Sequence, residues 1–271
     1  MEFGGRTDTG RVRENNEDSF RVAPDINLFV LSDGMGGQAS GEVASSLATE
    51  TVLAHCREAE ANPSLPLAGK PIEGVSRASN RLASAIRLAN RAVYESAQQD
   101  ERRRGMGATI VAVQSHDERM SVAHVGDSRA YRLRGGELEQ LTQDHSFVAE
   151  QVRQGMLTEQ EAGTSTLQSV LLRAVGIEPE VEVAVEEELV MEGDTVLLCS
   201  DGLTRELSDA QIAAILEDTG DTQEAADRLV DAANRAGGGD NVTVVVLRQS
   251  AKPVGAFARI GFFRRWFKNG G

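Results

Sequence analysis

The chain has 271 residues, a formal net charge of −14 and only two cysteines. This length suits one large domain, and no linker rich in Pro, Gly or Ser separates two apolar patterns. The negative charge argues against nucleic acid as a partner, because phosphate backbones are bound through cationic surface. A disulfide framework is excluded, and without a signal peptide or a membrane-spanning apolar run we expect a cytoplasmic protein.

Taken in chain order, the predicted elements alternate between short strands and longer helices. Helices are expected over residues 41–56 and 75–102. Later helices begin at Thr158, Ser208 and Asp221, because each has the type of an N-cap and a Glu or Gln three residues later. Strands are expected over residues 3–8, 19–22, 28–31, 108–113, 120–125, 130–133, 195–199 and 242–247.

Most of these strands are neighbours joined by tight polar turns, which favours antiparallel hairpins over crossover connections. Several are apolar almost without interruption, so each needs cover on both faces. We therefore predict an α+β fold, a four-layer α-β-β-α sandwich of two antiparallel sheets flanked by helices. Residues 1–250 are expected to form the domain, with a polar surface flap at about 144–178, and 251–271 to form a separate tail.

The tail combines five basic residues with no acidic one and carries several aromatic side chains. Such a mixture suits contact with an anionic membrane surface, which would place the protein at the membrane periphery, or with an acidic partner. A frayed extension without function is the alternative, and one short tract does not decide between them.

Four apolar runs are joined to an aspartate. The motif Ser-Asp-Gly ends two of them, LFVLSDG and VLLCSDG, and is predicted to stop each strand on Asp33 or Asp201. HVGDSR places Asp127 after a third strand, and GGGDN places Asp240 before a fourth. A single Asp-Gly pair is more often a simple turn. Four acids at strand edges together predict one acidic cluster.

Such a cluster requires a cation, because neighbouring carboxylates resist ionising together. The donors are hard oxygens without histidine or thiolate, which favours Mn²⁺, Mg²⁺ or Ca²⁺ over zinc. Metals clamped by aspartates usually serve hydrolysis or transfer of a phosphoryl group. The segment TDTGRVRENNEDS adds Arg11 and Arg13 as candidates to bind the phosphate, and Glu17 and Asp18 as further acids.

Seven motifs occur in order between about residues 3 and 247: TDTGRVRENNED, LFVLSDGMGGQASGEVAS, GMGATIVAV, HVGDSRAYRLR, LTQDHS, LLCSDGLT and GGGDNVTVVV. Together they resemble the metal-dependent type 2C serine/threonine protein phosphatases, the PPM family, in its bacterial form. The resemblance implies hydrolysis of phosphoserine and phosphothreonine in proteins that are substrates of a serine/threonine kinase. It also implies two Mn²⁺ or Mg²⁺ ions, with a third as an option, and we expect a monomer.

The resemblance implies the direct metal ligands residue by residue. Asp33 falls where the family bridges both metals, and Gly34 where a backbone carbonyl binds one of them. Asp201 and Asp240 fall on the remaining direct ligands. The implied mechanism is direct attack by a metal-bridging hydroxide, without a covalent phosphoenzyme.

Four further residues match more distant parts of the site. Glu17 and Asp18 match the acidic pair that holds the second metal, largely through water. Asp127 matches a ligand of the third metal. Arg13 matches the arginine that binds the phosphate and, with Asp33 and Asp201, completes the implied catalytic set.

The chain departs from the family at two places. Many relatives have a histidine just after the first Asp-Gly, as the acid for the leaving alkoxide, where this chain has Met35 and Gln38. That acid is therefore unassigned, with a metal-bound water as our interpretation and His145 kept open. The flap reads TSTLQSVLLRAVG at 164–176, where relatives carry His-Pro and Arg-Asn pairs, so substrate recognition is expected to differ there.

Two alternatives come from other classes of protein. Cys199 and Arg205 have the Cys-x5-Arg spacing of cysteine-dependent phosphatases, although Asp201 would place a negative charge inside such a loop. A non-catalytic binding protein of the same fold is the second alternative. Relatives of that kind usually lose several metal ligands, whereas this chain keeps them.

Overall fold

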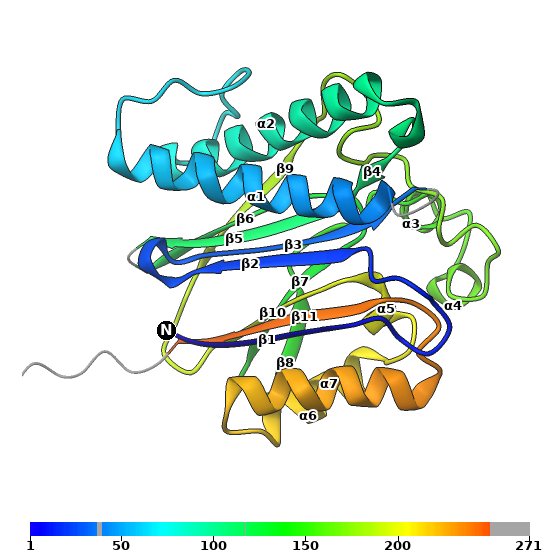
Figure 1. The fold of residues 1–271 in the computed structure, drawn as a ribbon. Coiled ribbons are helices and arrows are strands. Elements are labelled where there is room, and N and C mark those ends of the chain that lie inside the picture. The colour runs from blue at the N-terminus through cyan, green and yellow to red at the C-terminus, as the bar shows by residue number, and fades with distance from the viewer. Residues whose placement is uncertain (37–39, 117, 250–271) are drawn as a thin grey trace, which may run out of the picture.

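Two antiparallel sheets stack face to face between helices in the computed structural model, which describes residues 1–36, 40–116 and 118–249 (Figure 1). The first sheet has the strand order β1-β11-β10-β7-β8: β1 (Glu2–Asp8), β11 (Val242–Arg248), β10 (Thr195–Cys199), β7 (Arg129–Arg134) and β8 (Glu137–Gln140). The second has the order β2-β3-β5-β6-β9, with β4 paired to β3: β2 (Asp18–Ala23), β3 (Leu28–Met35), β4 (Gly107–Ala108), β5 (Ile110–His116), β6 (Arg119–Val125) and β9 (Ala184–Leu189).

Helices cover the outer face of each sheet. The second sheet is covered by α1 (Ser40–Ala61) and α2 (Arg77–Gln99), and the first by α6 (Asp209–Glu217) and α7 (Thr222–Ala236). Shorter helices gather at one end of the sandwich (Figure 1): α3 (Phe147–Arg153), α4 (Glu159–Ala162) and α5 (Asp201–Thr204), while the 3-10 turns are η1 (Pro24–Ile26) and η2 (Glu101–Arg103). The predicted α+β sandwich is thereby confirmed. Within the described ranges, none of the helices is both long and apolar enough to cross a bilayer.

The continuous apolar strands are explained by burial on both faces. In β3, Leu28 and Val30 pack into the core under α1 and α2, while Phe29 and Leu31 pack into the core between the two sheets. Successive side chains of a strand point to opposite faces, so a strand in the middle of this sandwich needs apolar residues at every position. The strands β10 and β11 show the same division between two cores.

The end of β3 differs from the prediction. We expected the strand to stop on Asp33, but β3 continues to Met35. The reason is the short strand β4, whose Gly107 and Ala108 pair with Met35 and Gly34. That pairing depends on a segment more than seventy residues away in the sequence, so no local signal announces it.

Other differences lie at the edges of the sheets. The sequence did not predict β8 or β9, and the single strand expected over 108–113 is divided between β4 and β5. The predicted N-caps are correct: Thr158 and Ser208 each form a capping box, and the side chain of Asp221 accepts from the N–H of Glu224. The expected tail at 251–271 lies outside the described residues.

Candidate metal and phosphate site

Carboxylates from several strand ends meet at one edge of the sandwich. Asp33 on β3 faces Asp18 on the neighbouring strand β2 as its cross-strand partner. Asp127 follows Gly126, the first residue after β6. Asp201 is the first residue of α5 after β10, and Asp240 lies just before β11. The charges of the other four all act on Asp33. The structure therefore brings together the acids that the sequence placed at strand edges.

A cleft of about 410 Å³ runs along this edge. It brings most of the residues predicted for the site into one space. The predicted residues that line it are Arg13, Glu17, Asp33, Gly34, Asp127, Asp201 and Asp240. Asn15, Thr109, Arg205 and Asn241 line it as well. Asp18 does not line the cleft but is buried, with hydrogen bonds inside the protein.

Burial and mutual repulsion make these acids hard to ionise. Burial raises the pKa of Asp33 well above its usual range, and the charges of Asp18 and Asp201 raise it further. Burial also raises the pKa of Asp18 and that of Asp127 to about 7. A buried carboxylate without a cation prefers its neutral form. The cluster therefore favours divalent cations as its partners at neutral pH.

The donor set fits hard divalent cations. One oxygen of Asp18 accepts hydrogen bonds from the hydroxyls of Ser200 at 2.9 Å and Thr243 at 2.6 Å. Its other oxygen, Oδ1, and Oδ1 of Asp201 are buried without a hydrogen-bond partner. Unpartnered buried carboxylate oxygens are costly unless a cation binds them. They suit Mn²⁺ or Mg²⁺, which take oxygen ligands.

Side chains alone do not complete the coordination of one ion. In the part of the chain that the structure describes, no three His, Cys, Asp or Glu side chains are grouped closely enough to hold a metal by themselves. Mg²⁺ commonly binds through one or two carboxylates and keeps several waters. The cleft therefore suits ions whose remaining ligands are water and backbone carbonyls.

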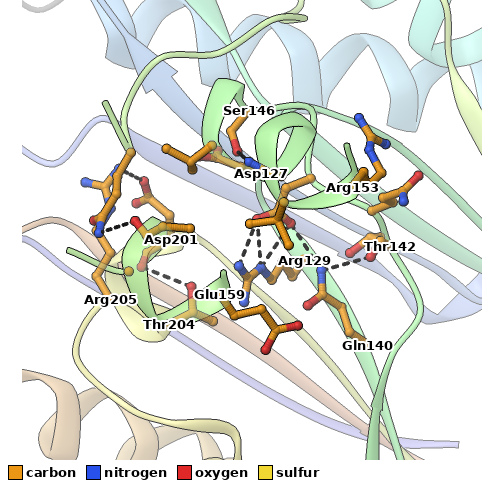
Figure 2. A pocket seen from close by; sticks show the side chains of 18 of the residues that line it. Asp127, Arg129, Gln140, Thr142, Ser146, Arg153, Glu159, Asp201, Thr204 and Arg205 are labelled. Atoms are coloured by element: carbon orange, nitrogen blue, oxygen red, sulfur yellow. Dashed lines mark hydrogen bonds and ion pairs between the residues drawn. The ribbon is translucent and has the colours of Figure 1, made fainter. Parts of the chain in front are cut away.

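Two arginines neutralise acids of the cleft. Arg13, with about half of its side chain exposed, donates to Oδ2 of Asp240 at 2.9 Å. Arg205 donates to the same oxygen at 3.1 Å and also contacts Asp201 (Figure 2). Of the two predicted candidates, Arg13 lines the cleft and Arg11 does not. Sequence reasoning missed Arg205 as a member of this site, although its spacing of four from Asp201 on a helix was a usable signal.

Asn241 holds the N-terminal segment against the start of β11. Its side-chain oxygen accepts from the N–H of Glu17 at 2.8 Å, and its amide donates to the carbonyls of Thr9 and Asn15, both at 2.9 Å. These three bonds fix the segment that carries Arg13. Sequence reasoning also missed this role, and the only signal for it is the asparagine of the GGGDN motif.

The backbone around Gly34 is packed too closely for any other residue. The N–H of Gly34 donates to the carbonyl of Glu17 at 3.1 Å. A Cβ at this position would lie 2.1 Å from the carbonyl oxygen of Gly41, at the start of α1. The Gly34 carbonyl, predicted as a metal ligand, is thus positioned by contact between three backbone segments.

The residues considered for the leaving-group acid have different surroundings. Met35 lines the cleft but carries no proton to donate, and Gln38 lies outside the described residues. His145 is buried and does not line the cleft; its Nδ1 accepts from the N–H of Gly126 at 3.1 Å and its ring stacks on His124. Burial and the charge of His124 lower the pKa of His145 to about 3. It is therefore neutral at physiological pH.

Cys199 is not placed for nucleophilic attack. Its side chain is fully buried in the core between the first sheet and the helices α5, α6 and α7. Burial raises the pKa of the thiol to about 12. A cysteine phosphatase needs an accessible thiolate, so the structure contradicts that alternative.

Comparison with known proteins gives consistent matches. A sequence model of the family described as protein phosphatase 2C matches residues 9–234. The chain is 40% identical over 247 residues to the serine/threonine protein phosphatase PstP of Mycobacterium tuberculosis, a match covering 91% of this chain and 44% of PstP. It is 35% identical over 248 residues to the serine/threonine phosphatase stp of Listeria innocua, covering 90% of this chain and 94% of stp. The chain thus spans less than half the length of the mycobacterial relative.

A solved structure agrees with these matches. The catalytic domain of PstP in complex with two manganese ions superimposes with a TM-score of 0.76 and 38% identity, covering 90% of this chain and 96% of that one. Similarity in sequence and in fold over nine-tenths of the chain confirms the predicted family and fold. The chain belongs to the protein phosphatase 2C family.

Proposed function

We propose that this protein hydrolyses phosphoserine and phosphothreonine in other proteins, with Mn²⁺ or Mg²⁺ as cofactor. One observation carries the proposal: a cleft that combines the carboxylates of Glu17, Asp33, Asp127, Asp201 and Asp240, among others, with the half-exposed Arg13. The carboxylates match a need for cations, and the arginine offers a planar fork for a phosphate. The names of the relatives support serine and threonine as the phosphorylated residues.

We assign the metal ligands within this proposal. Asp33, the Gly34 carbonyl, Asp201 and Asp240 would hold the two cations directly. Glu17 and Asp18 would act on the second, and Asp127 would bind a third. Bound divalent cations would supply water that ionises near neutral pH and would neutralise phosphate oxygens.

Arg13 would bind and orient the phosphate. Its guanidinium has five N–H donors, so it can keep its bond to Asp240 while others face the substrate. Because the segment that carries it is fixed through Asn241, the guanidinium is held near one position. Such positioning reduces the entropy lost when the phosphate is aligned for attack.

The first experiment measures turnover of p-nitrophenyl phosphate and of a phosphothreonine peptide. We expect hydrolysis with Mn²⁺ that a chelator abolishes and that Asp201→Asn lowers by about 10²–10³. Cys199→Ser serves as the matched control and should retain activity, because the thiol is buried away from the cleft. Absence of turnover under all metals would favour the non-catalytic alternative, and loss of activity in Cys199→Ser alone would contradict the metal mechanism.

We also propose that residues 1–250 form the phosphatase domain and that the tail docks on anionic membrane lipid. The tail lies outside the described residues, and its charge and aromatic composition support the proposal. A protein ending at Ser250 should hydrolyse p-nitrophenyl phosphate like the full chain and should lose binding to vesicles containing phosphatidylserine. Equal vesicle binding by both proteins would contradict the role of the tail.

A cytoplasmic, monomeric enzyme that acts on substrates of a serine/threonine kinase completes the proposal. The two free cysteines, both buried, are consistent with a reducing compartment. Light scattering on the full chain tests the monomer. Incubation with a proteome phosphorylated by a serine/threonine kinase tests the substrate class, since we expect phosphoserine and phosphothreonine to be lost.

A further inference from the structure

A second cavity, of about 550 Å³, adjoins the cleft of the proposed site. It lies between the flap helices α3 and α4 and the ends of strands β7 and β8 (Figure 2). Asp127, Asp201 and Arg205 line both the cavity and the cleft. A peptide whose phosphate occupies the cleft can therefore place a neighbouring side chain in this cavity. Its size is in the range of sites that bind small molecules.

On the flap side, apolar side chains line part of the cavity, beside Arg153, Glu159 and Gln168. The apolar side chains are Val148, Ala149 and Val152 of α3. Val152 lies four positions after Val148 and three after Ala149, so the three side chains share one face of the helix. Ala162 of α4 extends this apolar surface. Such a surface suits an aliphatic segment of a bound side chain.

In the described part of the chain, the basic side chains that line the cavity are all paired with acids, whereas some of its acidic side chains have no basic partner. All three arginines that line it have carboxylate partners. Three of its carboxylates, Asp127, Glu159 and Asp209, have no ion-pair partner among the described residues, and Asp127 belongs to the proposed metal site. Both Glu159 and Asp209 are exposed, and Asp209 accepts a long hydrogen bond, 3.4 Å, from the hydroxyl of Tyr131. The partners of the arginines are Asp144 for Arg129, Glu150 for Arg153, and Asp201 with Asp240 for Arg205.

The ion pair between Arg129 and Asp144 closes the cavity on the sheet side. Arg129 donates through Nε and Nη2 to both oxygens of Asp144, at 3.0 and 2.8 Å, and through Nη1 to the hydroxyl of Tyr131. Because Asp144 neutralises the charge of its guanidinium, Arg129 attracts an anion only weakly. The remaining charge available to a ligand is therefore negative.

We propose that this cavity binds a lysine or arginine side chain of the phosphoprotein, one or two residues from the phosphorylated residue. The inference rests on the proposed phosphatase function. A basic side chain has an apolar stem that can lie on the apolar face of α3 and a cationic end that can reach Glu159 and Asp209. An extended chain advances about 3.3–3.6 Å per residue, so a near neighbour of the phosphorylated residue is within reach.

The test compares phosphothreonine peptides that differ only at the positions flanking the phosphothreonine, with Arg, Gln or Glu. Because partly exposed charge pairs are weak, we expect the wild-type protein to prefer Arg over Gln by about fivefold to tenfold in kcat/KM, mainly through KM. The double variant Glu159→Gln/Asp209→Asn should lose this preference. Glu58→Gln/Glu60→Gln, which removes two exposed acids near the far end of α1, should retain it.

Several results would overturn the proposal. One is a wild-type protein that shows no preference or that prefers the Glu peptide, and another is a preference that persists in Glu159→Gln/Asp209→Asn. Hydrolysis of p-nitrophenyl phosphate with Mn²⁺ distinguishes failure of the cavity assignment from failure of the phosphatase function. If the wild-type protein hydrolyses it but does not discriminate between peptides, only the cavity assignment fails. If it hydrolyses neither, the phosphatase function fails and the cavity assignment with it.

Discussion

The two Ser-Asp-Gly copies begin alike and end differently. In the first, Asp33 and Gly34 remain in strand β3, which continues to Met35. In the second, β10 ends at Cys199 and Asp201 begins the helix α5. The same three residues are thus compatible with a strand and with a helix N-terminus. Distant segments decide the structure after each motif, β4 for the first copy and the start of β11 for the second.

The two copies nevertheless meet one requirement in common, which is close approach of another backbone at the glycine. A Cβ on Gly34 would lie 2.1 Å from the carbonyl oxygen of Gly41, and a Cβ on Gly202 would lie 2.0 Å from that of Asn241. The serines differ in their partners, since Ser32 donates to the carbonyl of Thr109 and Ser200 to the carboxylate of Asp18. The motif therefore specifies an acid beside a tightly packed backbone rather than a type of secondary structure.

The largest expected effect is on catalysis, and it tests whether the two aspartates are equivalent despite their different backbones. Asp33→Asn and Asp201→Asn should each lower kcat with Mn²⁺ by about 10²–10³, because a metal site contributes several kcal/mol to transition-state stabilisation. Steady-state hydrolysis of p-nitrophenyl phosphate measures this. A loss in only one variant would mean that the two copies do not serve the same centre.

Asp33→Asn should have the opposite effect on stability when a chelator is present. Burial and the neighbouring charges raise the pKa of Asp33 well above its usual range, so its ionised form is unfavourable in the folded protein. A neutral asparagine relieves this repulsion, and the free energy of unfolding at pH 8 should stay equal or rise. Urea unfolding in chelator measures it, and clear destabilisation would contradict the picture of a strained acidic cluster.

Metal binding should stabilise the wild-type protein. The gain in stability reports binding at the acidic cluster and does not depend on catalytic activity. Mn²⁺ at 100 times its dissociation constant should raise the free energy of unfolding by about 2.7 kcal/mol, because it binds only the folded state. Asp33→Asn and Asp201→Asn should each remove most of that gain. Thermal unfolding with and without Mn²⁺ checks this, with Mg²⁺ as a second metal. An unchanged gain in both variants would place the metal elsewhere.

Substitution of the glycine in each Ser-Asp-Gly motif is expected to have an intermediate effect on stability. Gly34→Ala and Gly202→Ala should each destabilise the protein by about 1–3 kcal/mol, because the added methyl group cannot be accommodated without moving a backbone segment. Gly220→Ala is a matched control, since a Cβ at that position meets no atom within 4 Å. It should change stability by less than about 0.5 kcal/mol. Equal losses of unfolding free energy in all three variants, measured by urea unfolding, would contradict the close backbone contacts at Gly34 and Gly202.

The parts of the fold that the sequence could predict are those with a local signal. The strands β3, β10 and β11 are apolar at nearly every position because each lies between two cores, and this pattern is visible in the sequence. The acidic strand β9, AVEEEL, has no such pattern. It exists through backbone pairing with β6 at the edge of its sheet. Edge strands with one exposed face leave little trace in hydrophobicity.

The site divides in the same way. Asp33, Asp201 and Asp240 could be predicted because each is attached to an apolar run. Arg205 and Asn241 could not, because their roles come from contacts across the fold. Arg205 reaches Asp240, which is 35 residues away, and Asn241 binds Glu17, which is 224 residues away. Sequence patterns thus identified the acids that meet in the cleft, whereas the residues that position them appeared only once the segments were assembled.

The smallest expected effect separates the two serines. Ser200→Ala removes a hydroxyl that donates to Asp18 and accepts from the N–H of Thr243 at 3.0 Å, whereas Ser32→Ala removes a donor to one carbonyl. Hydrogen bonds to charged groups contribute about 1.5–3 kcal/mol, and those between neutral groups about 0.5–1.5 kcal/mol. With Mn²⁺ at pH 8, Ser200→Ala should therefore lower the free energy of unfolding by about 1 kcal/mol more than Ser32→Ala. Equal losses would mean that Ser200 supports the backbone rather than the carboxylate of Asp18.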